Sequence, residues 1–330
     1  MESKINRLYH NIKPGMIKSF KIALAALAAI AIAGELGLKN SATAGIITVL
    51  SIQNTKRETL KSARNRALAF VCALMLSAGS FFILDYTLWA FALYLFLFAF
   101  LCLFMGWGEA IAMDSVLVTH FLAEKNMSSV LMWNEVLLFG IGTALGILVN
   151  LHLCRKEAEF DRLAEEADIQ IKGILHRMSL WLLREDKSEY TAGCFDSLQK
   201  VLDSAKRCAA SNYGNALFNA DTRELDYIKM REQQSLILKE IYLNIKGLAY
   251  LPGQAAQVAQ LLDRIEQCYH RDNTVKDLLE ELERLMRQMK EEQLPQSREE
   301  FEARAVLFYI LKQLQSFLEL KRQFVLFKND

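Results

Sequence analysis

The chain has 330 residues, of which 52% are hydrophobic, and its 39 Lys/Arg against 38 Asp/Glu leave a formal net charge of +1. A balance so close to neutral gives no reason to expect a nucleic acid as partner. The six cysteines are scattered without a CxxC pair, so we expect no disulfide framework, no metal site and no cofactor.

The two halves of the chain differ in composition. Residues 1–153 carry 12 Lys/Arg and 8 Asp/Glu, nearly all in short clusters between apolar runs, whereas residues 154–330 carry 27 and 30, spread evenly. The sequence therefore predicts an all-α protein with a transmembrane domain at 1–153 and a water-soluble helical domain at 154–330.

Apolar runs in the first half predict six transmembrane helices. The two clearest, 67–84 and 88–105, hold about 18 uncharged residues each, enough to cross a bilayer as a helix. The full set of predicted spans is 17–38, 42–53, 67–84, 88–105, 110–123 and 134–153. We interpret the first as a retained span and not as a cleaved signal peptide, because further spans follow it.

The distribution of Lys and Arg predicts the orientation. A polar turn at 51–66 contains Lys56, Arg57, Lys61, Arg64 and Arg66, whereas the loops on the opposite side hold only two Lys residues. Basic residues beside a span mark the cytoplasmic side of a membrane. Both the N-terminus and the second half are therefore expected in the cytoplasm.

The second half is predicted to be a cytoplasmic bundle of helices. Apolar residues recur at helical spacing, and no sustained alternation indicates strands. The first helix is expected to continue from the sixth span to about Lys187. The others are expected near 194–210, 222–248 and 253–270, from 274 to the break at Pro295, and over 298–327.

Several short motifs give the first half a family resemblance. They are Lys18–Ala33, Ala44–Gln53 followed by Arg57 and Ala63–Arg66, Gly106–Ala110, and Gly140–Asn150. Together they resemble the membrane domain of the bacterial aromatic acid exporter family, which is related to the fusaric acid resistance exporters. The second half is similar to the helical C-terminal domain of one branch of that family.

The resemblance implies a multi-pass protein of the bacterial inner membrane that exports aromatic carboxylic acids. Some relatives carry two membrane domains in one chain, so a single six-span domain implies a homodimer. Fold similarity alone transfers function weakly.

A substrate-binding role is considered for Gln53, Arg57 and Arg66, which flank the second and third spans at the cytoplasmic side. Guanidinium groups form paired hydrogen bonds with carboxylates, so arginines at this mouth suit an acid substrate. The alternative is that the basic residues only fix the orientation and contact anionic lipids. We further predict a structural ion pair between Arg66 and Glu109, which lies in the next cytoplasmic turn.

Asp114 and His120 are the ionisable residues of the fifth span. Such groups are costly inside a membrane, and in transporters they often carry protons. We therefore consider them for proton coupling. The alternative is that the fifth span is short and tilted, so that both side chains reach the interface.

Two functions remain open from the sequence. The first is an efflux transporter for aromatic or other small organic acids. The second is a membrane-anchored interaction or sensor protein, in which the spans serve as an anchor and the helical bundle recruits partners. The sequence contains no nucleophile motif and no phosphate-binding loop, so an enzyme is not expected.

Overall fold

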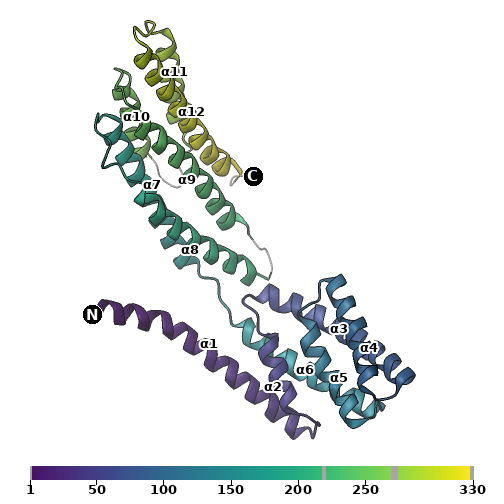
Figure 1. Cartoon of the computed structure of the whole chain (residues 1–330). Helices are drawn as coiled ribbons and strands as arrows, with labels where there is room; N and C mark the ends of the chain where they lie inside the picture. The colour runs from purple at the N-terminus through teal and green to yellow at the C-terminus, as the bar shows by residue number, and fades with distance from the viewer. Residues whose placement is uncertain (1, 218–220, 269–273, 328–330) are drawn as a thin grey trace. The chain divides into compact units, whose positions relative to one another are not determined.

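The computed structural model describes residues 2–217, 221–268 and 274–327, and these contain twelve α-helices and no strand (Figure 1). The chain forms two compact units. The first, called here the membrane unit, is Met1–Arg155 with Gly214–Asn219. The second, called the helical unit, is Lys156–Tyr213 with Ala220–Asp330. The predicted all-α class is confirmed.

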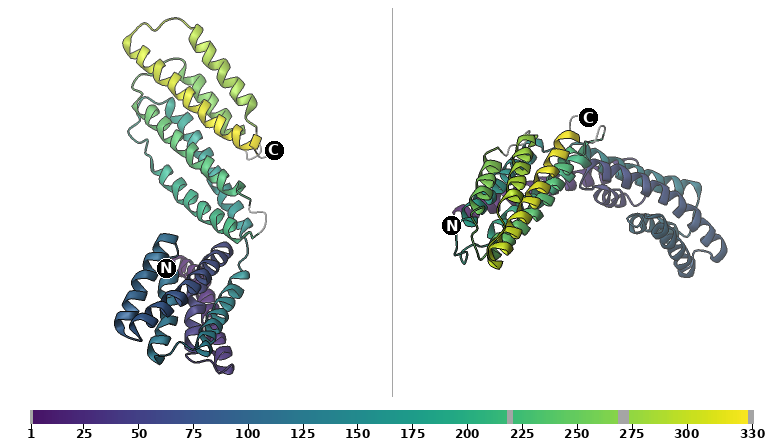
Figure 2. Two further views of the ribbon diagram at one scale, coloured as in Figure 1. Left: turned by 90° about the vertical axis from the view of Figure 1, so that its right-hand side faces the viewer. Right: turned by 90° about the horizontal axis from the view of Figure 1, so that it is seen from above.

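The membrane unit contains six helices of unequal length. They are α1 (Glu2–Glu35), α2 (Ala42–Ser51), α3 (Lys56–Leu84), α4 (Leu88–Met105), α5 (Ala110–Glu124) and α6 (Ser129–Leu151). Helix α2 packs against α1 and α6, while α3 packs against α4, α5 and α6 (Figures 1 and 2).

Four helices in the described part of the chain are long and apolar enough to cross a membrane: Gly15–Glu35 within α1, and α3, α4 and α6. The other two predicted spans correspond to shorter helices. At 1.5 Å per residue, the 10 residues of α2 rise about 15 Å and the 15 of α5 about 22 Å, against a hydrocarbon core of about 30 Å.

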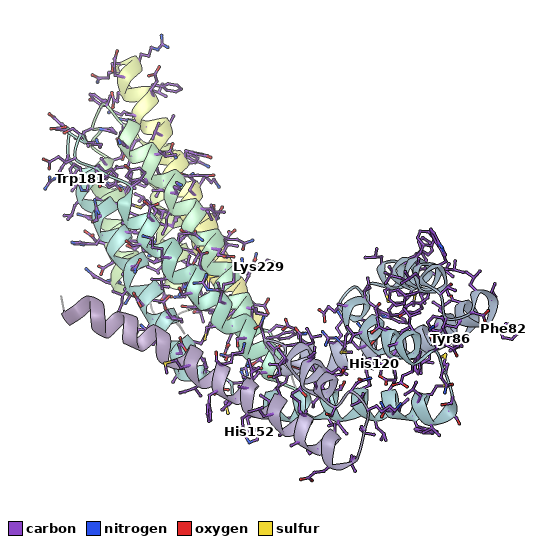
Figure 3. The ribbon with its side chains drawn as sticks, turned by 60° about the horizontal axis from the view of Figure 1, so that its bottom comes forward. Phe82, Tyr86, His120, His152, Trp181 and Lys229 are labelled. Carbon is purple, nitrogen blue, oxygen red and sulfur yellow. The ribbon has the colours of Figure 1, made fainter. Side chains whose placement is uncertain are left out.

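The outer surface of the membrane unit is apolar. Phe82 on α3 is 90% exposed and Trp89 on α4 is 80% exposed, and Figure 3 shows Phe82 at the edge of this unit. Large apolar side chains normally avoid water, so such a surface suits contact with lipid tails or with another protein.

The predicted polar turn at 51–66 is wrong in extent. Only residues 52–55 lie outside helices, and α3 begins at Lys56, eleven residues before the predicted start of the third span. Thr55 provides the reason, because its side chain accepts a hydrogen bond from the Glu58 amide at 3.3 Å. This N-cap satisfies a free amide at the start of the helix, so the basic residues extend α3.

Small residues allow α2 and α6 to approach closely. A Cβ atom at Gly142 of α6 would lie 2.6 Å from Ile47 of α2, and one at Gly146 would lie 2.6 Å from the Ser51 side chain. At these distances a larger residue would require the neighbouring atoms to shift. Glycine therefore sets the distance between these helices, as is common in membrane proteins.

The helical unit contains the other six described helices. They are α7 (Glu157–Leu182), α8 (Gly193–Asn215), α9 (Arg223–Gly247), α10 (Ala255–Cys268), α11 (Lys276–Glu291) and α12 (Arg298–Phe327). Helix α7 packs on α9 and α10, and α12 packs on α9 and α11. The core includes fully buried residues from five of these helices: Ile171, Leu198, Leu238, Leu262 and Leu314.

The expected continuous helix from the sixth span into the second half is wrong. Helix α6 ends at Leu151 and α7 starts at Glu157. The Lys156 amide, which a continuous helix would engage internally, instead donates to Asn212 Oδ1 of α8 at 2.7 Å. The Lys156 amide is therefore paired with a side chain and not with a backbone carbonyl of a helix.

Candidate functional site

A pocket of about 360 Å³ opens in the membrane unit where the start of α3 meets the turn between α4 and α5. Its walls are mostly polar and include one tryptophan. The lining residues are Gln53, Asn54, Glu58, Lys61, Ser62, Asn65, Arg66, Gly106, Trp107, Glu109 and Ala110.

Arg66 forms the inner wall of this pocket and is only 4% exposed. Its Nη1 donates to the carbonyl of Leu50 in the last turn of α2 at 2.7 Å. A guanidinium suits this position, because the end of a helix carries unpaired carbonyls and partial negative charge. Among the described residues, Arg66 Nε is buried and has no hydrogen-bond partner.

Glu109 lies opposite Arg66, with its Oε2 3.6 Å from Arg66 Nη2. The same oxygen accepts a hydrogen bond from Ser62 Oγ at 2.7 Å. The Glu109 side chain is 63% exposed. The separation from Arg66 exceeds that of a charge-assisted hydrogen bond, which is about 2.7–2.9 Å. Glu109 is therefore a loose partner of the arginine and is fixed mainly by Ser62.

Asp114 of α5 is fully buried, and neither carboxylate oxygen has a hydrogen-bond partner among the residues the structure describes. Arg66 is the cation whose charge acts on it. An isolated buried carboxylate is costly, so the nearby arginine compensates part of its charge. Asp114 thus belongs with the arginine at the inner side of the pocket, although it does not line the pocket.

His120, which is labelled in Figure 3, belongs to a different polar cluster. Its Nδ1 is 2.7 Å from Oε2 of Glu135 on α6, and its Nε2 is 3.5 Å from Thr43 Oγ1 on α2. Glu135 is fully buried. The structure therefore gives His120 a carboxylate partner other than Asp114.

The sequence-predicted residues are thus divided between two places. Gln53, Arg66 and Glu109 line one pocket, and Asp114 lies on the same side. Arg57 does not line that pocket, and His120 lies in the second cluster.

The sequence analysis missed several participants, among them Ser62 of the pocket and Glu135 of the second cluster. Ser62 gives no sequence signal. Glu135 does give one, since it is an acidic residue at the start of an apolar run, where ionisable groups are rare.

These features define a multi-pass, all-helical membrane protein with ionisable groups buried between its helices. Comparison with known families agrees. The model described as "Aromatic acid exporter family member 1" matches residues 15–153. The model described as "Putative aromatic acid exporter C-terminal domain" matches residues 157–322. The chain belongs to the aromatic acid exporter family, as its motifs predicted.

Two individual proteins are also similar to the chain. "Uncharacterized protein YqjA" of Bacillus subtilis (strain 168) is 26% identical over 307 residues, which is 93% of this chain and 95% of that protein. A crystal structure titled as a "putative membrane protein from Clostridium difficile 630" is 26% identical. It covers 50% of this chain and 98% of its own, with a TM-score of 0.45.

Proposed function

We propose that the protein exports small organic acids, above all aromatic carboxylic acids, across the bacterial cytoplasmic membrane. In this proposal all six helices of the membrane unit lie in the bilayer, with the short α2 and α5 shielded by their neighbours. The N-terminus and the helical unit lie in the cytoplasm, and two copies work as a homodimer. Family membership supports a transporter in place of an enzyme.

The observation that carries the proposal is the buried arginine in the pocket wall. Arg66 is held by the end of α2 and lines the pocket, and its Nη2 contacts Glu109 Oε2 at a distance of 3.6 Å. A substrate carboxylate would replace the loosely held Glu109 at the guanidinium and form the shorter, paired hydrogen bonds that Arg favours. Trp107 lines the same pocket and offers an aromatic surface for the ring of the acid.

Proton coupling completes the proposed mechanism. Asp114 and His120 both lie on α5, so a change in their charge acts on the helix that carries part of the pocket wall. When an anion leaves Arg66, the arginine and Asp114 again balance each other. The outward movement of the anion and the inward movement of a proton both carry positive charge into the cell, so an inside-negative membrane voltage drives both.

Efflux of labelled aromatic acids from loaded cells tests this function. We expect cells with the wild type to lose label faster than cells without the protein. Arg66→Lys should lower the initial rate of efflux by about tenfold or more, since one ammonium group cannot bind the Leu50 carbonyl and also form paired hydrogen bonds with a carboxylate. Asp114→Asn should lower it similarly. Arg64→Lys is the matched control, because Arg64 is exposed on the same helix and does not line the pocket.

Equal retention with and without the protein, over a panel of acids, would contradict the transport function. If transport occurs but Arg66→Lys behaves as Arg64→Lys, the pocket is not the binding site. An anchoring role predicts that all three variants behave as the wild type.

A further inference from the structure

The second polar cluster joins four segments of the membrane unit. Glu135 of α6 is at its centre, with Oε2 2.7 Å from His120 Nδ1 of α5 and Oε1 accepting from Asn134 Nδ2 at 3.0 Å. Asn134 also binds the Lys39 backbone twice, accepting from its amide at 2.8 Å and donating to its carbonyl at 3.1 Å. Thr43 of α2 faces the other nitrogen of His120.

The pair of His120 and Glu135 is shielded from solvent. The Glu135 side chain is 0% exposed and that of His120 is 13% exposed. A buried carboxylate is stabilised by a cation or by a proton. The imidazole supplies the first when it carries a proton, and loss of that proton leaves a buried negative charge. The cluster therefore has two charge states of very different electrostatic energy.

Two further charged groups lie beside the pair. Lys39 Nζ binds Oε2 of Glu124 at 2.9 Å, and Glu124 is one helical turn beyond His120 on α5. Both are substantially exposed, 59% for Lys39 and 40% for Glu124. Because solvent screens exposed pairs, their charges act on the buried pair more weakly than the direct contact does.

The pair is separate from the arginine pocket but lies on the same short helix. Asp114 and His120 are six residues apart on α5, which corresponds to a rise of about 9 Å. The N-terminal half of α5 faces Arg66, and its C-terminal half holds the imidazole. A change at one end can thus be transmitted along a single rigid helix.

We infer that His120 and Glu135 together bind the transported proton, and that Asp114 serves as counter-ion to Arg66. The ligand of this site is a proton delivered from water. Its loss would weaken the contact of α5 with α6, and so favour a different position of α5 against α2 and α6. This assignment rests on the proposed function, and it separates the proton site from the anion site.

Two transport modes in proteoliposomes distinguish the roles. In exchange, labelled acid inside is replaced by unlabelled acid outside, and no net proton movement is needed. In gradient-driven transport, a pH difference drives net movement of the acid. We expect Glu135→Gln and His120→Gln to lower the gradient-driven rate by about tenfold or more, as for proton-relay residues of transporters. Exchange should stay within about twofold of the wild type, since the arginine pocket is intact.

Glu124→Gln is the matched control, because it removes an exposed carboxylate from the same end of α5. It should leave both modes unchanged. Gradient-driven transport by Glu135→Gln at the wild-type rate would overturn the inference and leave the exporter function standing. Loss of both modes in folded variants would also overturn it, since the pair would then be needed for binding of the acid. Absence of both modes in the wild type would instead contradict the proposed function.

A measurement independent of transport is the NMR signal of the histidine ring nitrogens in the full-length protein in detergent. His120 is identified among the five histidines by the signal lost in His120→Gln. We expect Glu135→Gln to change how the signal of this ring depends on pH, because it removes the carboxylate that contacts Nδ1 at 2.7 Å, and Glu124→Gln to leave that dependence as in the wild type. An identical pH dependence in Glu135→Gln and the wild type would overturn the inference whatever the transport result.

Discussion

At the scale of single residues, the helical unit contains a buried ion pair. Arg231 of α9 is 0% exposed, and its Nη2 lies 2.7 Å from Asp168 Oδ1 of α7. Tyr227 donates to the same oxygen at 2.6 Å. Burial raises the pKa of Tyr227, so the phenol keeps its proton and remains a donor. The carboxylate thus has two partners from α9.

Removal of Asp168 should destabilise the helical unit strongly. Asp168→Ala leaves a buried guanidinium without its carboxylate, and the loss of one partner of a buried pair costs about 3–5 kcal/mol. Glu166→Ala is the control, because Glu166 pairs with Arg162 on the exposed face of the same helix, at 3.3 Å, and such pairs contribute about 0–1 kcal/mol. Chemical unfolding of the full-length protein, followed by circular dichroism, measures both. Equal losses of stability would contradict the prediction.

The residue scale also shows what the sequence could predict about the site. Charged groups at membrane depth identify Asp114, and basic residues beside a span identify Arg66. The sequence does not predict which of these groups contact one another. Glu135 is fifteen positions from His120 along the chain, and their contact depends on how α5 and α6 pack. A single sequence does not predict how these two helices pack.

At the scale of helices, the close contact of α2 with α6 is the most restrictive feature. Gly142→Ala would place a Cβ 2.6 Å from Ile47 Cβ and 2.7 Å from the Ala44 carbonyl, which is backbone and cannot rotate away. The helices must then separate. Overpacking of this kind typically costs about 1–3 kcal/mol. We expect a lower melting temperature for the detergent-purified variant.

Gly140→Ala provides the comparison on the same helix. A Cβ there has no atom of the described structure within 4 Å, and alanine is the better helix former. Its melting temperature should equal or exceed that of the wild type. Should Gly142→Ala melt at the same temperature as Gly140→Ala, the close approach of α2 and α6 would be wrong.

Helix positions were predictable where the signal is local, and less so at the ends. Uncharged runs gave α4 its bounds of Leu88 and Met105. The start of α3 was missed because a cluster of charges resembles a turn, although Thr55 and Glu58 form the pattern of a helix start. The gap between α6 and α7 could not be predicted, since the partner of Lys156 is Asn212, 56 residues further along.

At the scale of the whole molecule, the proposed orientation can be tested with a native cysteine. Cys154 follows α6 and is the exposed cysteine of the described part of the chain. Burial raises the pKa of the Cys208 thiol, which makes that residue slow to react. With the helical unit in the cytoplasm, a membrane-impermeant maleimide should label Cys154 in inside-out vesicles and not in right-side-out vesicles.

Cys154→Ser should remove the rapid maleimide labelling of inside-out vesicles, which would show that Cys154 is the labelled residue. Fast labelling of the wild type in right-side-out vesicles would reverse the proposed orientation. Mass spectrometry of the digested protein assigns the modified residue, and solubilised protein shows the total reactivity.

The division into two units was foreseeable at this scale, because lipid-soluble and water-soluble compositions differ over long stretches. Family membership was likewise recognisable, since the order and spacing of several short motifs agree together. Association with a second copy of the chain produces no comparable pattern in the sequence. The exposed aromatic surface around Phe82 suits lipid tails and a second subunit equally well.

The shortness of α2 has an electrical consequence. Its ten residues rise only about 15 Å, and Arg66 is bound to its end. In the proposed arrangement, cytoplasmic water reaches the pocket partway through the bilayer, so the membrane voltage falls across the thinner remaining layer. Moving one negative charge through the full voltage releases about 2.3 kcal/mol per 100 mV. With the cell interior negative, the voltage itself would drive an acid anion outward from Arg66.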